Sequence, residues 1–427
     1  MKTTVRFNTE KLAKAVKKAS IGLKKAYVIT CNGQKRAEGY YVDIVANDGV
    51  IQAGTSVPVE FMDCDAAPFC MVLGREFGSA IFTVEHIAET VTVSLNATVV
   101  EVRCGDTKIA LALQADKDEN GKSLIEEFQF APTDNSYMVS MPAENFKEVV
   151  VFSGHTTTSD TSRGIENLIE LILKSRYEKD TCVGKVRGLA SDGATIASCE
   201  RGINNVTKMG TVNTPEGKRK GQIEVKEEIE YHVSLPCDKV IQMVNAMDKI
   251  SENDNVYMVL DKNYFVINIR DDMFMFKTRN ASYGPRACEM VDSQKECEVK
   301  VTLPKSEFVT ALSLVELVSP KDKEIFVLEQ KDKYNILVHD TECKTVSKIK
   351  GEIEGDFRTF AANSFRYKKC IEKAGCEDTV TVYFTSNDMP LSYIDGERNV
   401  VNIVMGLYYD KAAEYKSAIP SKNDNQK

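Results

Sequence analysis

One short pattern of apolar and polar positions occurs six times along the chain. In each copy an apolar residue stands near the end of a predicted strand, Pro, Asn or Gly follows three positions later, and an amphipathic helical pattern comes next. The copies start at Val5, Met71, Val139, Val233, Val301 and Phe360. A pattern that recurs six times without a catalytic motif indicates repeated architecture rather than a reaction centre.

Strand signals lie between the predicted helices. Residues 90–95 and 108–113 alternate between apolar and polar side chains, and residues 256–269 and 324–338 are rich in β-branched and aromatic side chains. Each copy therefore predicts one helix with a few strands. Roughly 60 to 70 residues separate most copies, which is longer than the roughly 20 to 50 residues of a solenoid repeat, so each copy predicts a small layer of helix on sheet.

Pairing the six copies predicts an α+β fold of three domains, each with two helices packed on antiparallel sheets. The domains span residues 1–130, 131–295 and 296–410. The longest interval contains residues 208–229, where a Thr-Pro-Glu-Gly stretch and Lys-Arg-Lys predict an extended exposed loop inserted in the second domain. Residues 411–427 are polar and predict a flexible C-terminal tail.

Composition changes this picture little. Of the 427 residues, 43% are hydrophobic and 28% are charged, as in an ordinary soluble protein. No apolar run approaches the roughly 20 residues that span a bilayer, and the N-terminus turns polar before the apolar region of a signal peptide could form. We therefore expect a cytoplasmic protein with no membrane partner.

Catalytic and metal-binding signatures are absent from the sequence. The 12 cysteines never pair as Cys-x-x-Cys, the 4 histidines are scattered, and none of the common nucleotide-binding, zinc-protease or serine-hydrolase motifs occurs. One enzymatic alternative is a Cys nucleophile beside His155 or His232, the latter five positions before Cys237. Such a pair lacks a third orienting group, so we expect a non-catalytic protein without cofactor or metal.

Charge is distributed unevenly. The formal net charge is −8, yet residues 11–25 contain six lysines and no acidic residue. With helical phasing, an apolar stripe of Leu12, Val16, Ala19 and Leu23 leaves these lysines largely toward solvent. Taken alone, a charge run of this kind is usually a solvated helix face.

Several stretches carry a family resemblance. The opening Met1-Lys2-Thr3-Thr4-Val5 precedes a helix rich in Leu and Lys, and four further stretches follow in order: SDTSRGI at 159–165, LASDG at 189–193, VSLP at 233–236 and NIVM at 402–405. Together with the sixfold repeat, they resemble the bacterial DNA sliding clamps, the beta subunits of DNA polymerase III, over residues 1 to about 409. The resemblance implies a ring of two identical chains joined head to tail, with helices lining a hole around duplex DNA.

In such a ring, basic helix faces would attract DNA phosphates loosely and without sequence preference, because topology retains the protein. Repetition on equivalent helices favours one shared DNA-facing surface over separate solvated faces. Basic character is concentrated in the first and last helices, and the second helix offers only Arg75. The candidate DNA-contacting residues are Lys11, Lys14, Lys17, Lys18, Lys24, Lys25, Lys147, Lys239, Lys305, Arg366, Lys369 and Lys373.

The resemblance also implies an apolar pocket, between the second and third domains, that binds short peptide motifs of polymerases, clamp loaders and repair proteins. Aliphatic and Met side chains suit the hydrophobic anchors of such peptides, although any one of them could equally be core. The residues carried over are Ile165, Ser191, Gly193, Ala194, Thr195, Ile196, Pro285, Met290, Asn363, Met389, Pro390, Ile403, Val404 and Met405.

Two departures from the family pattern affect this pocket. The family usually continues after Asp192-Gly193 with a His or Arg pair and Leu, whereas this chain has Ala194, Thr195 and Ile196. Shortly after Pro285 the family tends to place a basic residue, and this chain has Glu289. We therefore expect a pocket with an altered peptide preference.

The ring joint is expected at an edge strand of the first domain, around Ile109 and Leu111, with Leu317 and Val318 of the third domain as its counterpart. An unpaired apolar edge is a liability unless another strand or chain covers it. The alternative is that these residues belong to the core.

These observations predict a homodimeric sliding clamp, a processivity factor for DNA replication that tethers the replicative polymerase and other proteins to duplex DNA. A separate loader would place it on DNA. The alternative is a clamp-derived scaffold that binds proteins without encircling DNA.

Overall fold

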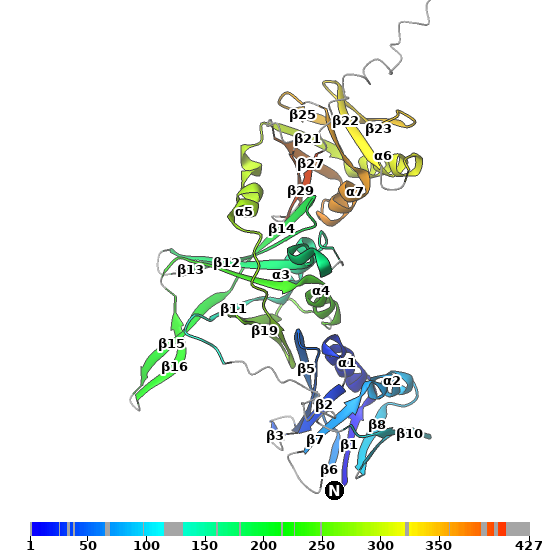
Figure 1. Ribbon diagram of the computed structural model, residues 1–427, viewed down its shortest axis with the longest axis vertical. Coiled ribbons are helices and arrows are strands. Elements are labelled where there is room, and N and C mark those ends of the chain that lie inside the picture. The colour runs from blue at the N-terminus through cyan, green and yellow to red at the C-terminus, as the bar shows by residue number, and fades with distance from the viewer. Residues whose placement is uncertain are drawn as a thin grey trace, which may run out of the picture. The chain divides into compact units, whose positions relative to one another are not determined.

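The computed structural model describes the backbone in the following residue ranges: 2–24, 26–31, 35–36, 39–64, 69–96, 98–114, 131–158, 161–178, 181–214, 217–225, 227–247, 250–320, 324–357, 359–385, 391–396 and 400–406. The predicted tail at 411–427 and the predicted first domain boundary at residue 130 lie outside these ranges. Within them the chain is α+β, with antiparallel sheets and short helices (Figure 1).

The six predicted strand-to-helix junctions are confirmed. Each strand ends at the expected Pro, Asn or Gly: β1 Lys2–Asn8, β7 Phe69–Gly74, β11 Tyr137–Pro142, β17 Ile229–Pro236, β21 Val299–Pro304 and β26 Phe360–Asn363. Each helix begins at the next residue: α1 Thr9–Ala19, α2 Arg75–Val84, α3 Ala143–Gly154, α4 Cys237–Ala246, α6 Lys305–Val318 and α7 Ser364–Lys373.

The chemistry of the junction residue explains these helix starts. The side chains of Asn8 and Asn363 accept hydrogen bonds from the backbone N–H groups of Lys11 and Arg366, which have no partner inside the helix. Proline serves at three of the other junctions because a residue preceding a helix donates no intrahelical hydrogen bond, and Gly74 stands at the fourth.

Contacts divide the chain into two compact units. The first contains residues 1–147, 173–184 and 202–280, and the second contains residues 148–172, 185–201 and 281–427. Strands β12 Leu168–Glu178 and β13 Thr181–Ser191 contribute residues to both units.

Two antiparallel sheets form the first unit. One has the strand order β10-β9-β8-β1-β6, and the longer one runs β16-β15-β11-β18-β19-β20-β5-β4-β2-β7, with β3 beside β4. The strands not yet delimited are β2 Ala26–Cys31, β3 Lys35–Arg36, β4 Gly39–Asn47, β5 Ile51–Pro58, β6 Phe61–Cys64, β8 Thr90–Asn96, β9 Val99–Cys104, β10 Thr107–Ala112, β15 Asn205–Thr214, β16 Gly217–Glu224, β18 Asn255–Leu260, β19 Tyr264–Ile269 and β20 Asp272–Lys277.

Helices α1 and α2 lie together on the core of this unit (Figure 1). Leu12 and Val16 of α1 and Phe77 and Ile81 of α2 are fully buried among strand residues of both sheets. The apolar stripe predicted for α1 therefore faces the core. Burial of four such side chains contributes several kcal/mol to folding.

The long sheet continues across a predicted domain boundary. Strand β20, from the predicted second domain, pairs with β5 of the first, from Asp272 opposite Thr55 to Phe276 opposite Ile51. The three-domain division stays a prediction, because the described contacts group these strands in one unit.

The second unit contains the strand order β14-β29-β28-β27-β21-β25 and a four-stranded sheet with the order β24-β23-β22-β26. The remaining strands are β14 Thr195–Gly202, β22 Ile325–Asp332, β23 Asn335–Asp340, β24 Val346–Lys350, β25 Glu352–Glu354, β27 Thr379–Phe384, β28 Leu391–Gly396 and β29 Val400–Met405. Phe308 and Leu312 of α6 and Tyr367 and Ile371 of α7 pack into one core with these sheets.

Two elements differ from the sequence prediction. Residues 208–229 were expected to form a loop, but most of them belong to β15 and β16, which pair from Thr207 opposite Glu224 to Thr214 opposite Gly217. The β-branched residues of β15 favour a strand, which the turn and charge signals obscured. Helix α5 Pro285–Asp292 was not predicted, and Pro285 stands at its first turn, where a missing N–H costs nothing.

Candidate nucleic-acid and peptide-binding surfaces

Helix α1 presents lysines on the side opposite its buried stripe. Lys11, Lys14 and Lys17 are exposed, and so is Lys24 after the helix. The Lys14 Nζ lies 2.6 Å from the carboxylate of Glu10, an exposed pair one turn away that contributes little to stability. Lys25 lies outside the described residues.

Lys18 differs from the other lysines of α1. Only 8% of the residue is exposed, and its Nζ lies 2.8 Å from the Asp272 carboxylate, whose other oxygen accepts a hydrogen bond from the Thr55 hydroxyl at 2.6 Å. The prediction that Lys18 faces solvent is therefore wrong. At this point α1 meets the β5 and β20 strands, so the side chain points into the fold and not away from it.

Lys239 of α4 also contacts other residues of the first unit. Its Nζ lies 2.9 Å from the Asp48 carboxylate and donates to the carbonyl of Ile21 at 2.9 Å. Burial alone would raise the pKa of Asp48, but hydrogen bonds from the Ile51 and Val50 amides and from Lys239 outweigh it and lower that pKa.

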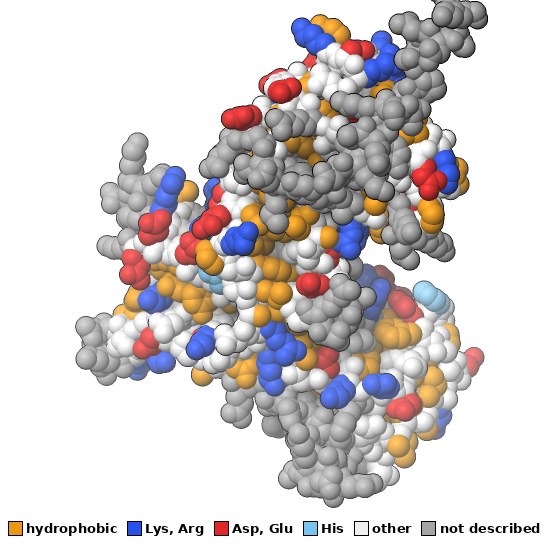
Figure 2. Space-filling model, turned by 45° about the horizontal axis from the view of Figure 1, so that its top comes forward, with side chains coloured by type: hydrophobic (Ala, Val, Ile, Leu, Met, Phe, Trp, Pro, Cys, Tyr) orange, Lys and Arg blue, Asp and Glu red, His pale blue; other side chains and the backbone are white. Residues whose placement is uncertain are grey.

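The other predicted cations have varied surroundings. Lys147 lies 3.6 Å from Glu144, and Lys305 donates to the Cys376 carbonyl. Lys369 and Lys373 are exposed on α7, whereas Arg366 pairs with Asp192. On the face shown in Figure 2, Lys and Arg side chains occur singly or in small groups among acidic and apolar ones.

A surface cleft of about 350 Å³ lies where α1 meets β5 and β20. Its lining includes Lys11, Lys14 and Arg270 together with Asp271 and the buried Lys18–Asp272 pair. Basic and acidic side chains both line this cleft, so the carboxylates partly neutralise the positive charge of its lysines and arginine.

The predicted peptide surface is organised by Tyr283, which sequence reasoning missed. Its hydroxyl accepts a hydrogen bond from the Ser191 amide at 3.1 Å and lies 2.9 Å from the Ile165 carbonyl. The carboxylate of Glu170, only 1% exposed, accepts bonds from the Tyr283 amide at 3.0 Å and the Ser282 hydroxyl at 2.6 Å. These contacts fasten the segment before α5 to strands β12 and β13. An aromatic residue in an irregular segment gave no signal of this role.

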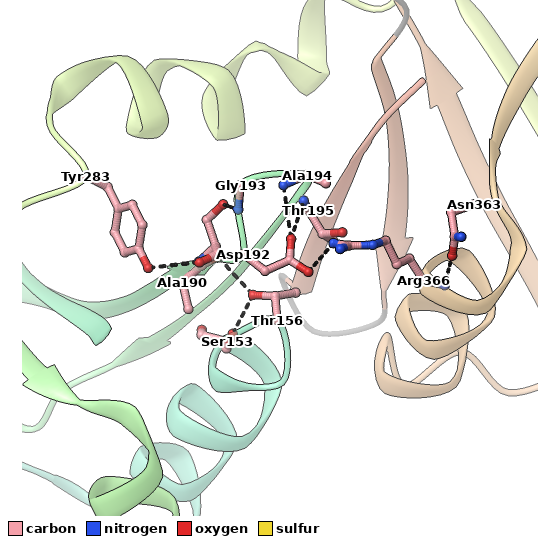
Figure 3. Close-up of polar contacts among 11 residues, drawn as sticks. Ser153, Thr156, Ala190, Asp192, Gly193, Ala194, Thr195, Tyr283, Asn363 and Arg366 are labelled. Carbon is pink, nitrogen blue, oxygen red and sulfur yellow. Dashed lines mark hydrogen bonds and ion pairs between the residues drawn. The ribbon is translucent and has the colours of Figure 1, made fainter. Parts of the chain in front are cut away.

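The turn after β13 is held by Asp192 (Figure 3). One carboxylate oxygen accepts the amides of Ala194 and Thr195 at 3.1 and 2.8 Å, and the other accepts a hydrogen bond from the Arg366 guanidinium of α7. Gly193 has a φ of 87°, and a Cβ there would stand 3.0 Å from the Glu166 carboxylate, so glycine suits this turn.

Strand β29 runs beside this turn. The Met405 amide donates to the Ala194 carbonyl at 3.1 Å, and Thr195 and Ile196 lie opposite Val404 and Ile403. Ile403 and Val404 are buried in the core, whereas Met405 is 39% exposed.

The structure thus brings one group of the predicted pocket residues together around the Asp192 turn. Ile196 and Met290 are half-buried and pack with Ile403, while Pro285 is exposed at the start of α5. Asn363 lies at the start of α7, where it caps Arg366. Met389 and Pro390 lie outside the described residues.

Of the predicted ring-joint residues, Ile109 and Leu111 lie on β10, the edge strand of its sheet. Both are half-buried against the core, and the alternate residues of the strand are exposed. Near the end of α6, Leu317 is 78% exposed and Val318 is half-buried.

Titratable groups do not assemble into a reaction centre in the described chain. Burial lowers the pKa of His155 to about 4, and its Nδ1 lies 2.7 Å from the Phe152 carbonyl. His232 contacts Glu230 at 3.1 Å, whereas Cys237 is buried in α4. Among the described side chains, no group of three or more His, Cys, Asp or Glu could hold a metal ion. No described helix has the length and apolar character needed to cross a membrane.

Comparison with known proteins identifies the fold. No protein-family model matches the chain, and no curated protein matches its sequence. Solved structures do match. The DNA polymerase sliding clamp from Bacillus subtilis has a TM-score of 0.71 at 14% identity, over 95% of this chain and 99% of the clamp.

Two other solved structures are similar over the same 95% of this chain and 99% of their own. The DNA polymerase III beta subunit from Thermotoga maritima has a TM-score of 0.69 at 15% identity, and that from Pseudomonas aeruginosa has 0.70 at 12% identity. The chain therefore has the sliding-clamp fold.

Proposed function

We propose that this protein is a DNA sliding clamp, a ring-shaped processivity factor that encircles duplex DNA and tethers a replicative polymerase. The observation that carries the proposal is the fold, which matches DNA polymerase III beta subunits over 95% of this chain and nearly all of theirs. In this role the protein works in the cytoplasm as a non-catalytic subunit and uses no cofactor.

The exposed lysines of α1 support the DNA-facing part of the proposal. Lys11, Lys14 and Lys17 stand on one exposed side of a helix whose other side is core, and Lys369 and Lys373 stand on α7. We assign these cations to phosphate contacts, whereas Lys18 and Lys239 hold the fold together. A few loose contacts suffice because a closed ring is retained by topology.

The ring requires two copies of the chain. We propose that the β10 edge of one copy meets the end of α6 in another, because β10 is the outermost strand of its sheet among the described strands and Leu317 is strongly exposed. Open strand edges and exposed apolar side chains favour association with a complementary surface. A head-to-tail contact of this kind closes into a ring when it is made twice.

Other partners are proposed to bind around the Asp192 turn. These are the polymerase, a clamp loader and further proteins with short apolar motifs, whose side chains would contact Met405 and its half-buried neighbours Ile196 and Met290. Burial of two such anchors contributes about 3 to 6 kcal/mol, a large part of the roughly 8 kcal/mol that a micromolar complex needs.

The decisive experiment is retention on DNA of different topology. The protein is loaded with its clamp loader and ATP onto nicked circular DNA, and the DNA is then cut once with a restriction enzyme. Encirclement predicts that protein co-eluting with the circle in gel filtration is lost within minutes of cutting. Equal retention on the circular and cut DNA would overturn encirclement, and peptide binding without any topological retention would favour the scaffold alternative.

A further inference from the structure

Arg366 occupies a defined position beside the Asp192 turn, although the sequence pattern had assigned it to DNA. Its backbone amide donates to the Asn363 side chain at 2.9 Å, and its guanidinium Nη1 donates to the carboxylate of Asp192 (Figure 3). The Arg366 side chain is 39% exposed and that of Asp192 20%. The Asn363 side chain therefore fixes the backbone of Arg366 and Asp192 fixes its guanidinium, while part of the side chain remains accessible.

The donors and acceptors of this pair are unequal in number. Asp192 accepts three hydrogen bonds, two from the Ala194 and Thr195 amides and one from Arg366. A guanidinium has five N–H donors, and within the described part of the chain only Nη1 of Arg366 is used by another side chain. Nε and Nη2 are left for an acceptor that these residues do not supply.

Apolar residues stand next to the Asp192 turn, which Arg366 contacts. The Ala194 carbonyl, two residues from Asp192, accepts the Met405 amide, and Met405 lies opposite Leu391 in the β28–β29 ladder. Met405 is 39% exposed and Leu391 is half-buried. The surface thus combines apolar contacts with a positioned cation.

Other charges modify this surface. Lys369 and Lys373 follow Arg366 at one and two turns on α7 and are exposed, while the Glu166 carboxylate lies beside Gly193. An anionic group is therefore favoured on the α7 side of the turn and disfavoured near Gly193.

We infer that Arg366 is a specificity-determining residue of this surface and that it selects a partner peptide with a carboxylate next to its apolar anchors. The inference rests on the proposed function, because it assumes that partner peptides bind here. A carboxylate matches the planar fork of a guanidinium, and charge-assisted hydrogen bonds are roughly twice as strong as neutral ones. Because Asp192 already orders the side chain, little rotamer entropy is lost on binding.

The test uses the full chain and two fluorescein-labelled nonapeptides with the same Leu and Phe anchors, one with Glu and one with Gln between them. Fluorescence anisotropy is expected to give about tenfold tighter binding of the Glu peptide. Arg366→Gln should abolish this preference, and Arg366→Lys should retain part of it. Lys373→Gln is the control. It removes the same charge two turns away and should change the ratio of the two peptides' dissociation constants less than twofold.

A second variant distinguishes peptide recognition by Arg366 from an effect of Arg366 on the structure of the turn. Asp192→Asn removes the pairing charge but leaves the arginine, so the Glu preference should persist in part, reduced because the side chain is less ordered. If Asp192→Asn abolishes the preference for the Glu peptide as completely as Arg366→Gln does, the arginine only orders the turn and the inference fails.

The outcomes separate this inference from the proposed function. Equal binding of both peptides to the unmodified protein overturns the inference and leaves the clamp intact. Binding of neither peptide removes the peptide surface and the inference together, while retention on circular DNA still reports on encirclement. If Arg366→Gln shortens that retention and leaves peptide selection unchanged, Arg366 belongs to the DNA surface.

Discussion

Lys17 and Lys18 are neighbours in the sequence, yet their side chains have different surroundings. Lys17 is exposed, whereas Lys18 is buried with Asp272 and Thr55. A buried charge is tolerated only with a partner, so these two lysines have different roles despite their identical chemistry.

Replacing Lys18 by Met should lower the free energy of unfolding by about 3 kcal/mol, because Asp272 then remains buried without its cation. Urea denaturation followed by circular dichroism measures the change. Lys17→Met is the matched control and should shift the unfolding free energy by less than about 0.5 kcal/mol. Equal stability of the two variants would contradict a structural role for the buried pair.

His155 makes stability depend on pH. Burial lowers its pKa to about 4 in the folded chain, and Lys369 and Lys373 act in the same direction, whereas the Phe152 carbonyl and Asp192 oppose them. The ordinary pKa is 6.5, so between pH 6.5 and pH 4 the unfolded chain binds more protons than the folded one. Stability therefore falls as the pH decreases through this window.

A His155→Gln variant should lack this dependence. The difference in unfolding free energy between the unmodified protein and the variant should be constant above pH 7 and should shrink by up to about 3 kcal/mol by pH 4. Urea titrations at several pH values measure it. A difference that stays constant with pH would show that His155 titrates normally in the folded state.

Secondary-structure elements were the most predictable level of this molecule. The six strand-to-helix junctions follow from local chemistry, since an Asn cap or a Pro acts within one turn. Helix α5 and the β15–β16 hairpin were missed because an eight-residue helix and a charged strand carry weak periodicity. Side chains that act over long separations, such as Tyr283 with Ser191 or Lys18 with Asp272, left no pattern in the sequence.

The exposed side of α1 can be tested as an element. Changing Lys11, Lys14 and Lys17 together to Glu should reduce loading onto nicked circular DNA at least tenfold and flatten its salt dependence, because fewer counterions are released. Lys331, Lys333 and Lys350 are exposed lysines elsewhere, and their triple change to Glu gives the same charge difference. Equal loss in both triple variants would reflect net charge instead of an α1 surface.

The end of α6 is a second element to test. Leu317→Asp should convert the proposed dimer to monomer in sedimentation-velocity experiments, since a charge would replace an exposed apolar contact. The fold should be preserved because the side chain is 78% exposed. Tyr334→Asp, at a turn where the side chain is 61% exposed, is the control and should leave the assembly unchanged.

At the scale of the whole molecule, the repeat predicted the fold class but not how the sheets connect. Strands β5 and β20 pair although more than 200 residues separate them, and β14 pairs with β29 across a similar distance. Pairings of this kind depend on tertiary contacts that local periodicity does not encode. Sequence reasoning therefore selected residues that lie together around the Asp192 turn, but it did not predict the pairing that holds β14 against β29.

A protein that encircles DNA should stay on it under conditions that release a protein held by charge alone. Once loaded on closed circular DNA, the protein should remain through a wash in about 0.5 M NaCl, which screens exposed charges strongly. On a linear fragment it should be lost at any salt concentration. Gel filtration of the DNA-bound fraction measures both, and salt-sensitive loss from the circle would mean that charge alone holds the protein.

The pairing of β5 with β20 also has a mechanical consequence. Five residue pairs join these two strands edge to edge. The strands resist sliding past each other, because sliding would break all of the hydrogen bonds between them at once. The Lys18–Asp272 contact adds a tether from α1 to the same strand. This part of the chain is therefore stiff, and a force applied between α1 and β20 would be transmitted with little deformation to more compliant parts of the molecule.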